Sequence, residues 1–242
     1  MFQNYLIITG AGISVESGIK PFRGKGDTIW KENPQEIATN YYMKKYPLDF
    51  LEWYYKRFSL CKHALPNEAH EILAQKKIKL ITQNIDNLHV KAQHPKSHLL
   101  EIHGNIFLKR KLNVQSIEEL EFADWDKINE NQCRQDLAKL FHLNKDNQFD
   151  QTSYRPHILL FDEYYTSLYQ IELAQSWLKK AETIVFIGTS NSVGITQSIL
   201  QDGLNYGKKI LVVDPQPDAS FNHSAIELHR TTATDFCKKY FN

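Results

Sequence analysis

The sequence predicts an α/β protein built on a doubly wound parallel sheet of the Rossmann type, with a smaller, mainly helical insertion domain. Three observations support this prediction. Short apolar runs recur along the 242 residues, helical patterns separate most of these runs, and a glycine-rich turn follows the first run. Because 42% of the residues are hydrophobic, the chain has enough apolar side chains for a packed core.

The apolar runs are expected to form the buried strands of the parallel sheet. They are residues 5–9, 78–82, 98–102, 157–161, 183–188 and 209–213. Between most of them, apolar residues recur at helical spacing, as in the segments 66–77, 168–181 and 195–207. Strands that alternate with helices are typical of a parallel sheet covered on both faces.

Two stretches interrupt this alternation. Residues 35–65 contain no clear strand and are rich in Tyr, Phe and Trp, so we expect aromatic helices there. Residues 105–154 are charged and rich in Asn and Gln. We therefore predict a Rossmann-like domain made of residues 1–34, 66–104 and 155–242, with the two stretches forming a small inserted domain.

Composition and charge argue against several classes of protein. Lys and Arg number 29 against 28 Asp and Glu, so the net charge of +1 gives no field that would attract nucleic acid or a membrane surface, and neither is an expected partner. Cys61, Cys133 and Cys237 form no CxxC pair, which argues against a disulfide framework. With no leader and no apolar run near the ~18 residues of a membrane span, we expect a soluble cytoplasmic protein.

The stretch GAGISVESGIKPFRG, residues 10–24, begins where the first predicted strand ends. A strand that runs into Gly-Ala-Gly before a helix starts lets the backbone approach a pyrophosphate, and the free N–H groups of the helix face its charge. A tight turn without a ligand is the alternative. The turn therefore predicts a nucleotide phosphate site at residues 10–13.

The region after this turn does not fit a dehydrogenase. Dinucleotide-binding dehydrogenases carry an acidic residue at the end of the second strand, about 20 positions further on. Glu32 lies near that distance but in a predicted loop, which weakens the case for hydride transfer. Phe22 and Arg23 in this loop suit a lid that closes over a bound cofactor, with the ring on an apolar face and the guanidinium on a phosphate.

Polar side chains follow two further predicted strands. TQNIDNLH places Gln83, Asn84 and Asp86 at the carboxyl edge of the sheet, where open α/β folds bind ligands. EIHG places His103 beside Gly104 at the same edge, where an imidazole is suited to proton transfer. The alternative for His103 is a structural histidine with satisfied hydrogen bonds.

Five motifs together resemble those of one family. GAGISVESGIKPFRG, TQNIDNLH, EIHG, RPHILLFDE and FIGTSNS occur in the order and approximate spacing of the sirtuins, the NAD-dependent protein-lysine deacylases. The resemblance extends over residues 5–214. It implies that NAD is the cofactor, that an acyl-lysine protein or peptide is the partner, and that the acyl group leaves on ADP-ribose.

The resemblance also implies roles for individual residues. His103 matches the general base, Asn84 matches a residue that orders the reacting water, and Asp86 matches one that holds the nicotinamide carboxamide. Asp214 stands where the family usually has Asn, but a carboxylate can still accept a hydrogen bond from a ribose hydroxyl. The residues expected to bind NAD are Gly10, Ala11, Gly12, Ile13, Phe22, Arg23, Gln83, Asn84, Ile85, Asp86, Gly188, Thr189, Ser190 and Asp214.

The sequence also departs from the family in the insertion and in the FDE motif. Most sirtuins carry two CxxC pairs in the insertion, which hold a structural zinc, whereas this insertion contains only Cys133, so we predict no metal. The insertion should instead close around apolar residues, among them Trp125 and Phe122. FDE replaces the usual Phe-Gly-Glu, which puts Asp162 beside Phe161, the residue expected to contact the substrate; the carboxylate could clash with a peptide or select a basic one.

The helix predicted in FLEWYYKRFS carries Tyr54 and Arg57 three residues apart, so both lie on one face. A phenol and a guanidinium together match a carboxylate, and the pair resembles the Tyr-x-x-Arg of sirtuins that remove succinyl and malonyl groups. The alternative is an amphipathic helix with Tyr54 in the core and Arg57 in solvent.

Three functions remain open at this point. The first is an NAD-dependent protein-lysine deacylase that favours succinyl- and malonyl-lysine. The second is an NAD glycohydrolase or ADP-ribosyltransferase that uses the same pocket, and the third is a catalytically silent NAD-binding sensor.

Overall fold

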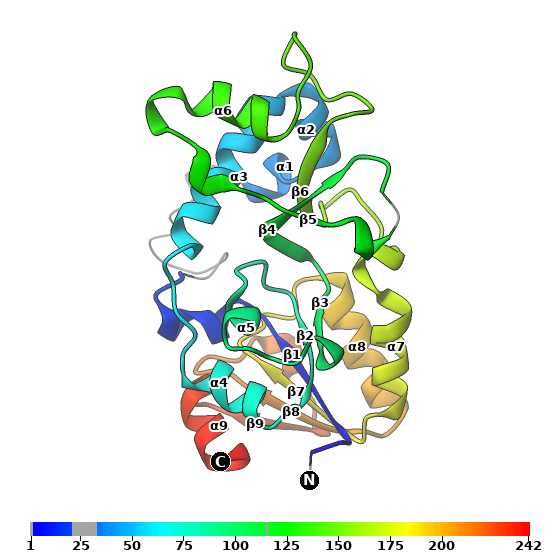
Figure 1. The fold of residues 1–242 in the computed structure, drawn as a ribbon. Helices are drawn as coiled ribbons and strands as arrows, with labels where there is room; N and C mark the ends of the chain where they lie inside the picture. Colours follow the sequence, from blue (N-terminus) through cyan, green and yellow to red (C-terminus); the bar gives the residue numbers. More distant parts are fainter. Residues whose placement is uncertain (1, 21–32, 115) are drawn as a thin grey trace.

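The computed structural model describes residues 2–20, 33–114 and 116–242, and its larger sheet has six parallel strands in the order β3-β2-β1-β7-β8-β9 (Figure 1). The predicted doubly wound parallel sheet is confirmed. Chain order reverses between β1 and β7, and ligands bind at this kind of switch point in open α/β sheets. The strands are β1 (Tyr5–Thr9), β2 (Lys79–Thr82), β3 (Leu99–Glu101), β7 (Thr183–Ile187), β8 (Lys209–Val213) and β9 (Ile226–His229).

Helices cover both faces of this sheet (Figure 1). On one face, α4 (Glu68–Gln75) and α9 (Ala233–Phe241) pack in one core cluster with Ile7 of β1. On the other face, α7 (Ile171–Lys180) and α8 (Gly194–Asn205) pack with Leu6 and Ile8 of the same strand. Because successive strand residues point to opposite faces, the continuous apolar run of β1 is what a strand buried on both faces requires. The short helix α5 (Leu88–Lys91) follows β2.

Among the described residues, a second, smaller assembly contains a three-stranded antiparallel sheet of order β5-β4-β6, together with four α-helices (Figure 1). The helices pack around an aromatic core that includes Phe50, Phe58, Trp125 and Phe141. The Trp125 indole N–H donates to the Ile106 carbonyl at 2.7 Å, which satisfies its only polar atom. These elements are α1 (Pro34–Ile37), α2 (Asn40–Lys45), α3 (Pro47–Cys61), β4 (Gly104–Lys111), β5 (Glu121–Phe122), α6 (Cys133–Leu140) and β6 (Tyr154–Ile158).

Two sequence predictions about these elements were wrong, and one strand was missed. The run at 157–161 was expected in the parallel sheet, but it overlaps β6, which pairs antiparallel with β4. The strand β9 was not predicted, because it is a short edge strand whose sequence mixes apolar and polar residues. Phe122, expected in the core of the insertion, is 59% exposed. The predicted boundaries of the two domains remain a prediction.

The described parts of the chain contain neither a membrane-spanning helix nor a cluster of metal ligands. Within residues 2–20, 33–114 and 116–242, no helix combines the length and apolar character that crossing a membrane would need. In the same ranges, no three His, Cys, Asp or Glu side chains are grouped so that they could hold a metal ion.

Candidate active site

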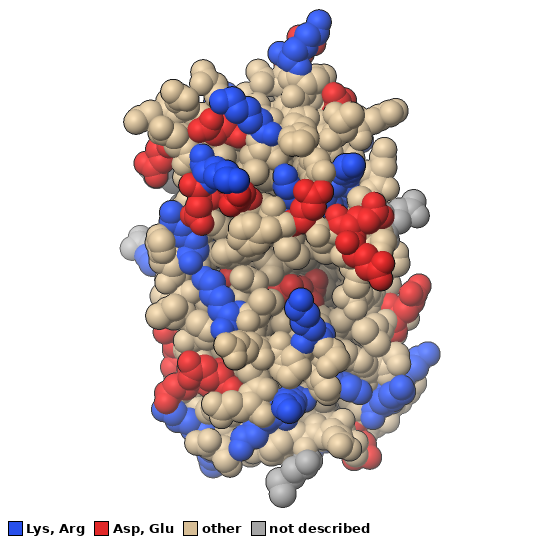
Figure 2. Space-filling model, viewed as in Figure 1, with Lys and Arg blue, Asp and Glu red and all other residues tan. Residues whose placement is uncertain are grey.

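A cavity of about 1020 Å³ lies between the carboxyl ends of the parallel strands and the smaller assembly. Its walls come from the loops that follow β1, β2, β3, β7 and β8, from α3, and from the segment after β6. Figure 2 shows Lys and Arg interspersed with Asp and Glu over one face of the molecule, without a continuous field of either sign. Binding in the cavity therefore depends on local side chains and backbone groups.

The glycine-rich turn after β1 packs directly against the loop after β7. The Gly12 N–H donates to the Gly188 carbonyl at 2.8 Å. Gly188 has a φ of +60°, and a Cβ on it would lie 2.5 Å from the Ile13 nitrogen and 2.6 Å from the Gly12 Cα. Only glycine fits so close a backbone contact at positive φ. The 3₁₀ helix Ala11–Ser17 begins at this point, so its first N–H groups lie at the switch point of the sheet.

We expect Gly188→Ala to lower the free energy of unfolding by at least about 2 kcal/mol and to abolish NAD binding, because the methyl group would force the two loops apart. Thermal unfolding and calorimetric titration with NAD measure the two effects. Gly194→Ala is the control for stability, since a Cβ there has no heavy atom within 4 Å. Equal unfolding temperatures for the two variants would contradict this reading of the loop contact.

Polar side chains after β2 form a network with this turn. The Asn84 amide donates to the Gly10 carbonyl at 3.0 Å and to the Ser14 hydroxyl at 3.1 Å. The Ser14 hydroxyl in turn donates to Asp86 at 2.7 Å. Gln83 extends the network toward α8 through a 2.6 Å hydrogen bond to the Thr196 hydroxyl. The predicted polar cluster therefore exists, and it fixes the position of each side chain relative to the glycine-rich turn.

The Asp86 carboxyl group is almost completely buried. One oxygen accepts from Ser14, and the other accepts from the Leu88 N–H at 3.0 Å. Burial raises the pKa of Asp86, and these hydrogen bonds partly oppose the rise. These two hydrogen bonds fix the orientation of the Asp86 carboxyl group at the wall of the cavity.

His103 lies at the crossing between the two sheets, between β3 and β4. Its Nδ1 is 3.0 Å from the Gln83 carbonyl, and its Nε2 is 2.8 Å from the Tyr165 hydroxyl. Burial lowers the pKa of His103 to about 4, so the ring is neutral near pH 7. Gly104 must follow, because at its φ of +84° a Cβ would lie 2.0 Å from the His157 carbonyl oxygen.

Tyr54 and Arg57 of α3 line the far wall of the cavity. Tyr54 is 2% exposed, and its ring contacts those of Phe50 and Trp53 with centroids 4.8 and 4.9 Å apart. The Arg57 guanidinium carbon lies 5.0 Å from the Trp53 ring centroid, and burial lowers the pKa of Arg57. Tyr54 is therefore buried, as the amphipathic alternative expected, but Arg57 is not in open solvent.

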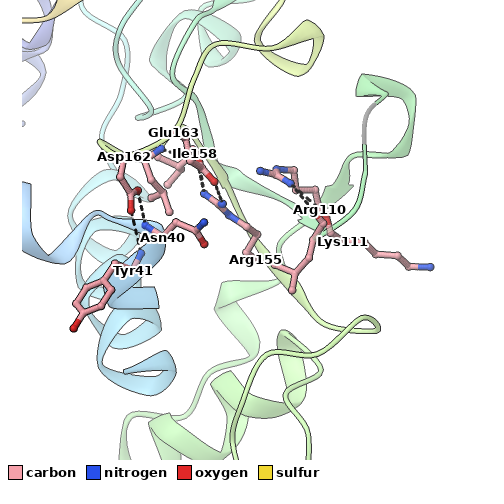
Figure 3. Close-up of polar contacts among 10 residues, drawn as sticks. Asn40, Tyr41, Arg110, Lys111, Arg155, Ile158, Asp162 and Glu163 are labelled. Atoms are coloured by element: carbon pink, nitrogen blue, oxygen red, sulfur yellow. Dashed lines mark hydrogen bonds and ion pairs between the residues drawn. The ribbon is translucent and has the colours of Figure 1, made fainter. Parts of the chain in front are cut away.

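The segment after β6 is held in place by Asp162 (Figure 3). Its carboxylate accepts from the N–H groups of Asn40 at 2.6 Å and Tyr41 at 3.1 Å, at the start of α2. The Phe161 N–H donates to the Ala38 carbonyl at 2.9 Å. Asp162 is thus engaged with α2, while the half-exposed Phe161 lines the cavity.

A buried ion pair fixes the same segment from its other side (Figure 3). The Arg155 guanidinium donates to both carboxylate oxygens of Glu163 and, at 2.7 Å, to the Ile158 carbonyl. Glu163 also accepts from the Leu160 N–H at 3.0 Å. The side chain of Arg155 is only 3% exposed, so its charge depends on Glu163 for compensation.

We expect Glu163→Gln to lower the free energy of unfolding by about 3 kcal/mol, because it leaves the buried Arg155 charge uncompensated. Urea unfolding, compared at constant m, measures the loss. The matched control is Glu68→Gln, which removes the same charge from an exposed pair with Lys238 and should leave the midpoint nearly unchanged. Equal midpoints for the two variants would show that the Arg155 pair does not stabilise the segment.

The structure brings most of the predicted site residues together. Ile13 is an exception, because its side chain is buried in the core and does not line the cavity. Phe22 and Arg23 lie outside the described residues. The predicted residues that line the cavity are Gly10, Ala11, Gly12, Tyr54, Arg57, Gln83, Asn84, Ile85, Asp86, His103, Phe161, Gly188, Thr189, Ser190 and Asp214.

Sequence reasoning missed two residues of this site. Ser14 follows the glycine-rich turn, and a hydroxyl at that place in the GAGIS stretch was a signal that could have been used. Tyr165 lies 62 residues from the histidine that it contacts, so no local pattern points to it.

Known proteins resemble this chain in sequence and in fold. Residues 10–194 match the model of the Sir2 family. The chain is 30% identical over 242 residues to an NAD-dependent protein deacylase of Bacteroides thetaiotaomicron, covering 96% of this chain and 94% of that protein. It is 32% identical over 227 residues to NAD-dependent deacetylase sir2E of Dictyostelium discoideum, covering 86% of this chain and 64% of that protein.

A solved structure shows the same fold. The crystal structure of a Sir2 homolog–NAD complex superimposes with a TM-score of 0.76 at 24% identity, covering 97% of this chain and 87% of that chain. The family match covers the glycine-rich turn, the polar network and the histidine described above. This chain therefore belongs to the Sir2 family.

Proposed function

We propose that this protein is an NAD-dependent protein-lysine deacylase that favours succinyl- and malonyl-lysine. The observation that carries the proposal is that one cavity is lined by the glycine-rich turn, by His103, and by the Tyr54–Arg57 pair. The protein is an enzyme of its family, and its cofactor is NAD. The acyl preference and the roles of single residues are the parts proposed here.

The cavity fits NAD. Gly12 and Gly188 bring two backbone loops into contact and line the cavity, and a backbone surface of this kind suits a pyrophosphate. Asp214 at the end of β8 can accept from an adenosine ribose hydroxyl, and Asn84 and Asp86 would hold the nicotinamide end. When bound, NAD supplies a nicotinamide leaving group and the ADP-ribose that takes up the acyl group.

The residues of this chain then have separate tasks. Asp86 and Asn84, fixed by Ser14, orient polar groups at the nicotinamide end. His103 is neutral near pH 7 and lines the cavity, so its unprotonated nitrogen can take up a proton there. The smaller assembly closes the cavity from the other side and excludes water.

The acyl preference depends on the cation in the cavity wall. A guanidinium keeps its charge even where burial lowers its pKa, and charged groups interact more strongly in such surroundings than in water. A carboxylate at the end of a succinyl or malonyl group would receive charge-assisted hydrogen bonds from Arg57 and from the Tyr54 hydroxyl. An acetyl group would place only a methyl near the same cation.

The glycohydrolase or ADP-ribosyltransferase alternative loses support from the contacts of Asp162. Asp162 was the residue that put peptide binding in doubt, and its carboxylate is engaged by the backbone of α2. The presence of His103 also weighs against a glycohydrolase, because glycosidic cleavage alone needs no base for acyl transfer. The segment at Phe161 thus remains available to a substrate peptide.

One experiment separates the three functions. The protein is incubated with NAD and a panel of acetyl-, malonyl- and succinyl-lysine peptides, and mass spectrometry follows nicotinamide, ADP-ribose and acyl-ADP-ribose. Peptide-dependent succinyl-ADP-ribose is expected. Peptide-independent ADP-ribose would support the glycohydrolase, and the absence of all products would support the sensor. A wide preference for acetyl-lysine would overturn the acyl assignment alone.

A further inference from the structure

The basic nitrogen of His103 is in contact with a tyrosine hydroxyl. The Tyr165 hydroxyl lies 2.8 Å from Nε2, and the two rings stack with centroids 6.0 Å apart and an interplanar angle of 30°. Both residues line the cavity. A hydroxyl at this distance is within normal hydrogen-bond range. The contact therefore affects whether a substrate hydroxyl can reach Nε2 directly.

The hydrogen bonds of the ring define its tautomer. The Gln83 carbonyl oxygen 3.0 Å from Nδ1 can only accept, so Nδ1 must carry the proton. In a neutral ring, Nε2 is then unprotonated and accepts from the Tyr165 hydroxyl. The lone pair that would take a substrate proton is therefore occupied by a phenol.

The position of Tyr165 is defined by its packing. It packs against the cluster of Val114, Leu168 and Tyr169 and also against the core that contains α7 and α8. The loop that carries it begins at the segment fixed by Asp162 and Glu163. The ring that carries the hydroxyl is therefore packed against two apolar clusters while the hydroxyl contacts His103.

We propose that Tyr165 relays the substrate proton to His103, and that it is a catalytic residue of this enzyme. The inference rests on the deacylase function proposed above. A ribose hydroxyl in the cavity donates its proton to the Tyr165 oxygen while the phenolic proton moves to Nε2. One ribose O–H bond and one phenol O–H bond break, and one phenol O–H bond and one N–H bond form. Tyr165 ends as a neutral phenol, His103 ends as an imidazolium, and the ribose oxygen is left as the nucleophile.

The chemistry of a phenol suits this role. While its hydrogen is donated to Nε2, the oxygen keeps lone pairs that can accept from a second hydroxyl. Burial raises the pKa of Tyr165, so the side chain does not ionise by itself and acts only by exchanging one proton for another. Direct transfer of the substrate proton to Nε2 would instead require the Tyr165 hydroxyl to give up its hydrogen bond to that nitrogen.

The test compares Tyr165→Phe with Tyr164→Phe. The first removes the relay oxygen and keeps the ring, and the second removes the same atom from a side chain that is 88% exposed. We expect kcat for deacylation to fall about 10- to 100-fold in Tyr165→Phe and to stay unchanged in Tyr164→Phe. A Tyr165→Phe enzyme as fast as the wild type, or faster, would overturn the relay, because the hydroxyl would then only block the base.

A second readout needs neither NAD nor turnover. Nitrogen-15 NMR of the ligand-free wild type should show His103 protonated at Nδ1 with Nε2 as a hydrogen-bond acceptor. In Tyr165→Phe the pKa of His103 should rise by about half a unit to one unit, since the hydrogen bond that favours the neutral ring is lost. A protonated Nε2, or an unchanged pKa, would overturn the relay. A wild type with this NMR signature that deacylates no peptide would instead overturn the proposed function, and with it the relay.

Discussion

Replacing His103 by alanine should reduce deacylation about 10²- to 10⁴-fold, the usual contribution of a general base. The structure gives the reason, because the neutral imidazole lines the cavity at the crossing between the two sheets. Acyl-ADP-ribose should fall by this factor in single-turnover assays. Binding of NAD, measured by calorimetry, should be retained, since the phosphate loops do not depend on this side chain.

The control for this variant is His63→Ala. His63 is exposed beyond the end of α3, so its removal should leave deacylation unchanged. If His103→Ala kept full deacylation activity, the assignment of His103 as the general base would be wrong. Equal losses in both variants would point to a general effect of losing a histidine.

Replacing Arg57 by methionine should lower turnover of succinyl-lysine about 10- to 150-fold, while acetyl-lysine turnover should change little. The loss corresponds to a charge-assisted hydrogen bond of roughly 1.5–3 kcal/mol between the guanidinium and the acyl carboxylate. Methionine keeps most of the apolar stem against Trp53, so packing is largely retained. Steady-state kcat/KM for both peptides measures the difference.

Lys56→Met is the matched control, because it removes a cation from the adjacent, exposed position of α3. It should leave the ratio of succinyl to acetyl turnover unchanged. Parallel losses for both peptides in Arg57→Met would contradict the acyl assignment and leave the NAD-dependent deacylase in place.

The parallel sheet could be predicted because its central strands are apolar on both faces. The run of β1 is buried on both sides, and this is the pattern that a local sequence search detects. The run at 157–161 shows the limit of this signal. Apolar character marks a strand as buried but does not determine which strand it pairs with. In this chain β6 pairs with β4, although β5 and α6 lie between them in the sequence.

Part of the site could be predicted for a similar reason. Asn84, Asp86 and His103 follow strands directly, so the sheet itself brings them to one edge. The contacts of Asp162 with α2 and of Tyr165 with His103 join positions that lie far apart in the chain. They depend on how the smaller assembly sits over the sheet, which no local pattern encodes.

The proposed nucleotide end and the proposed acyl end of the cavity lie on different elements. The loops after β1, β7 and β8 line the first, whereas Tyr54 and Arg57 of α3 line the second. No backbone of α3 enters the contact between Gly12 and Gly188. The range of acyl groups accepted could therefore change in evolution independently of NAD binding. Changes along a single helix could retarget the enzyme to another lysine modification while its demand for NAD stayed the same.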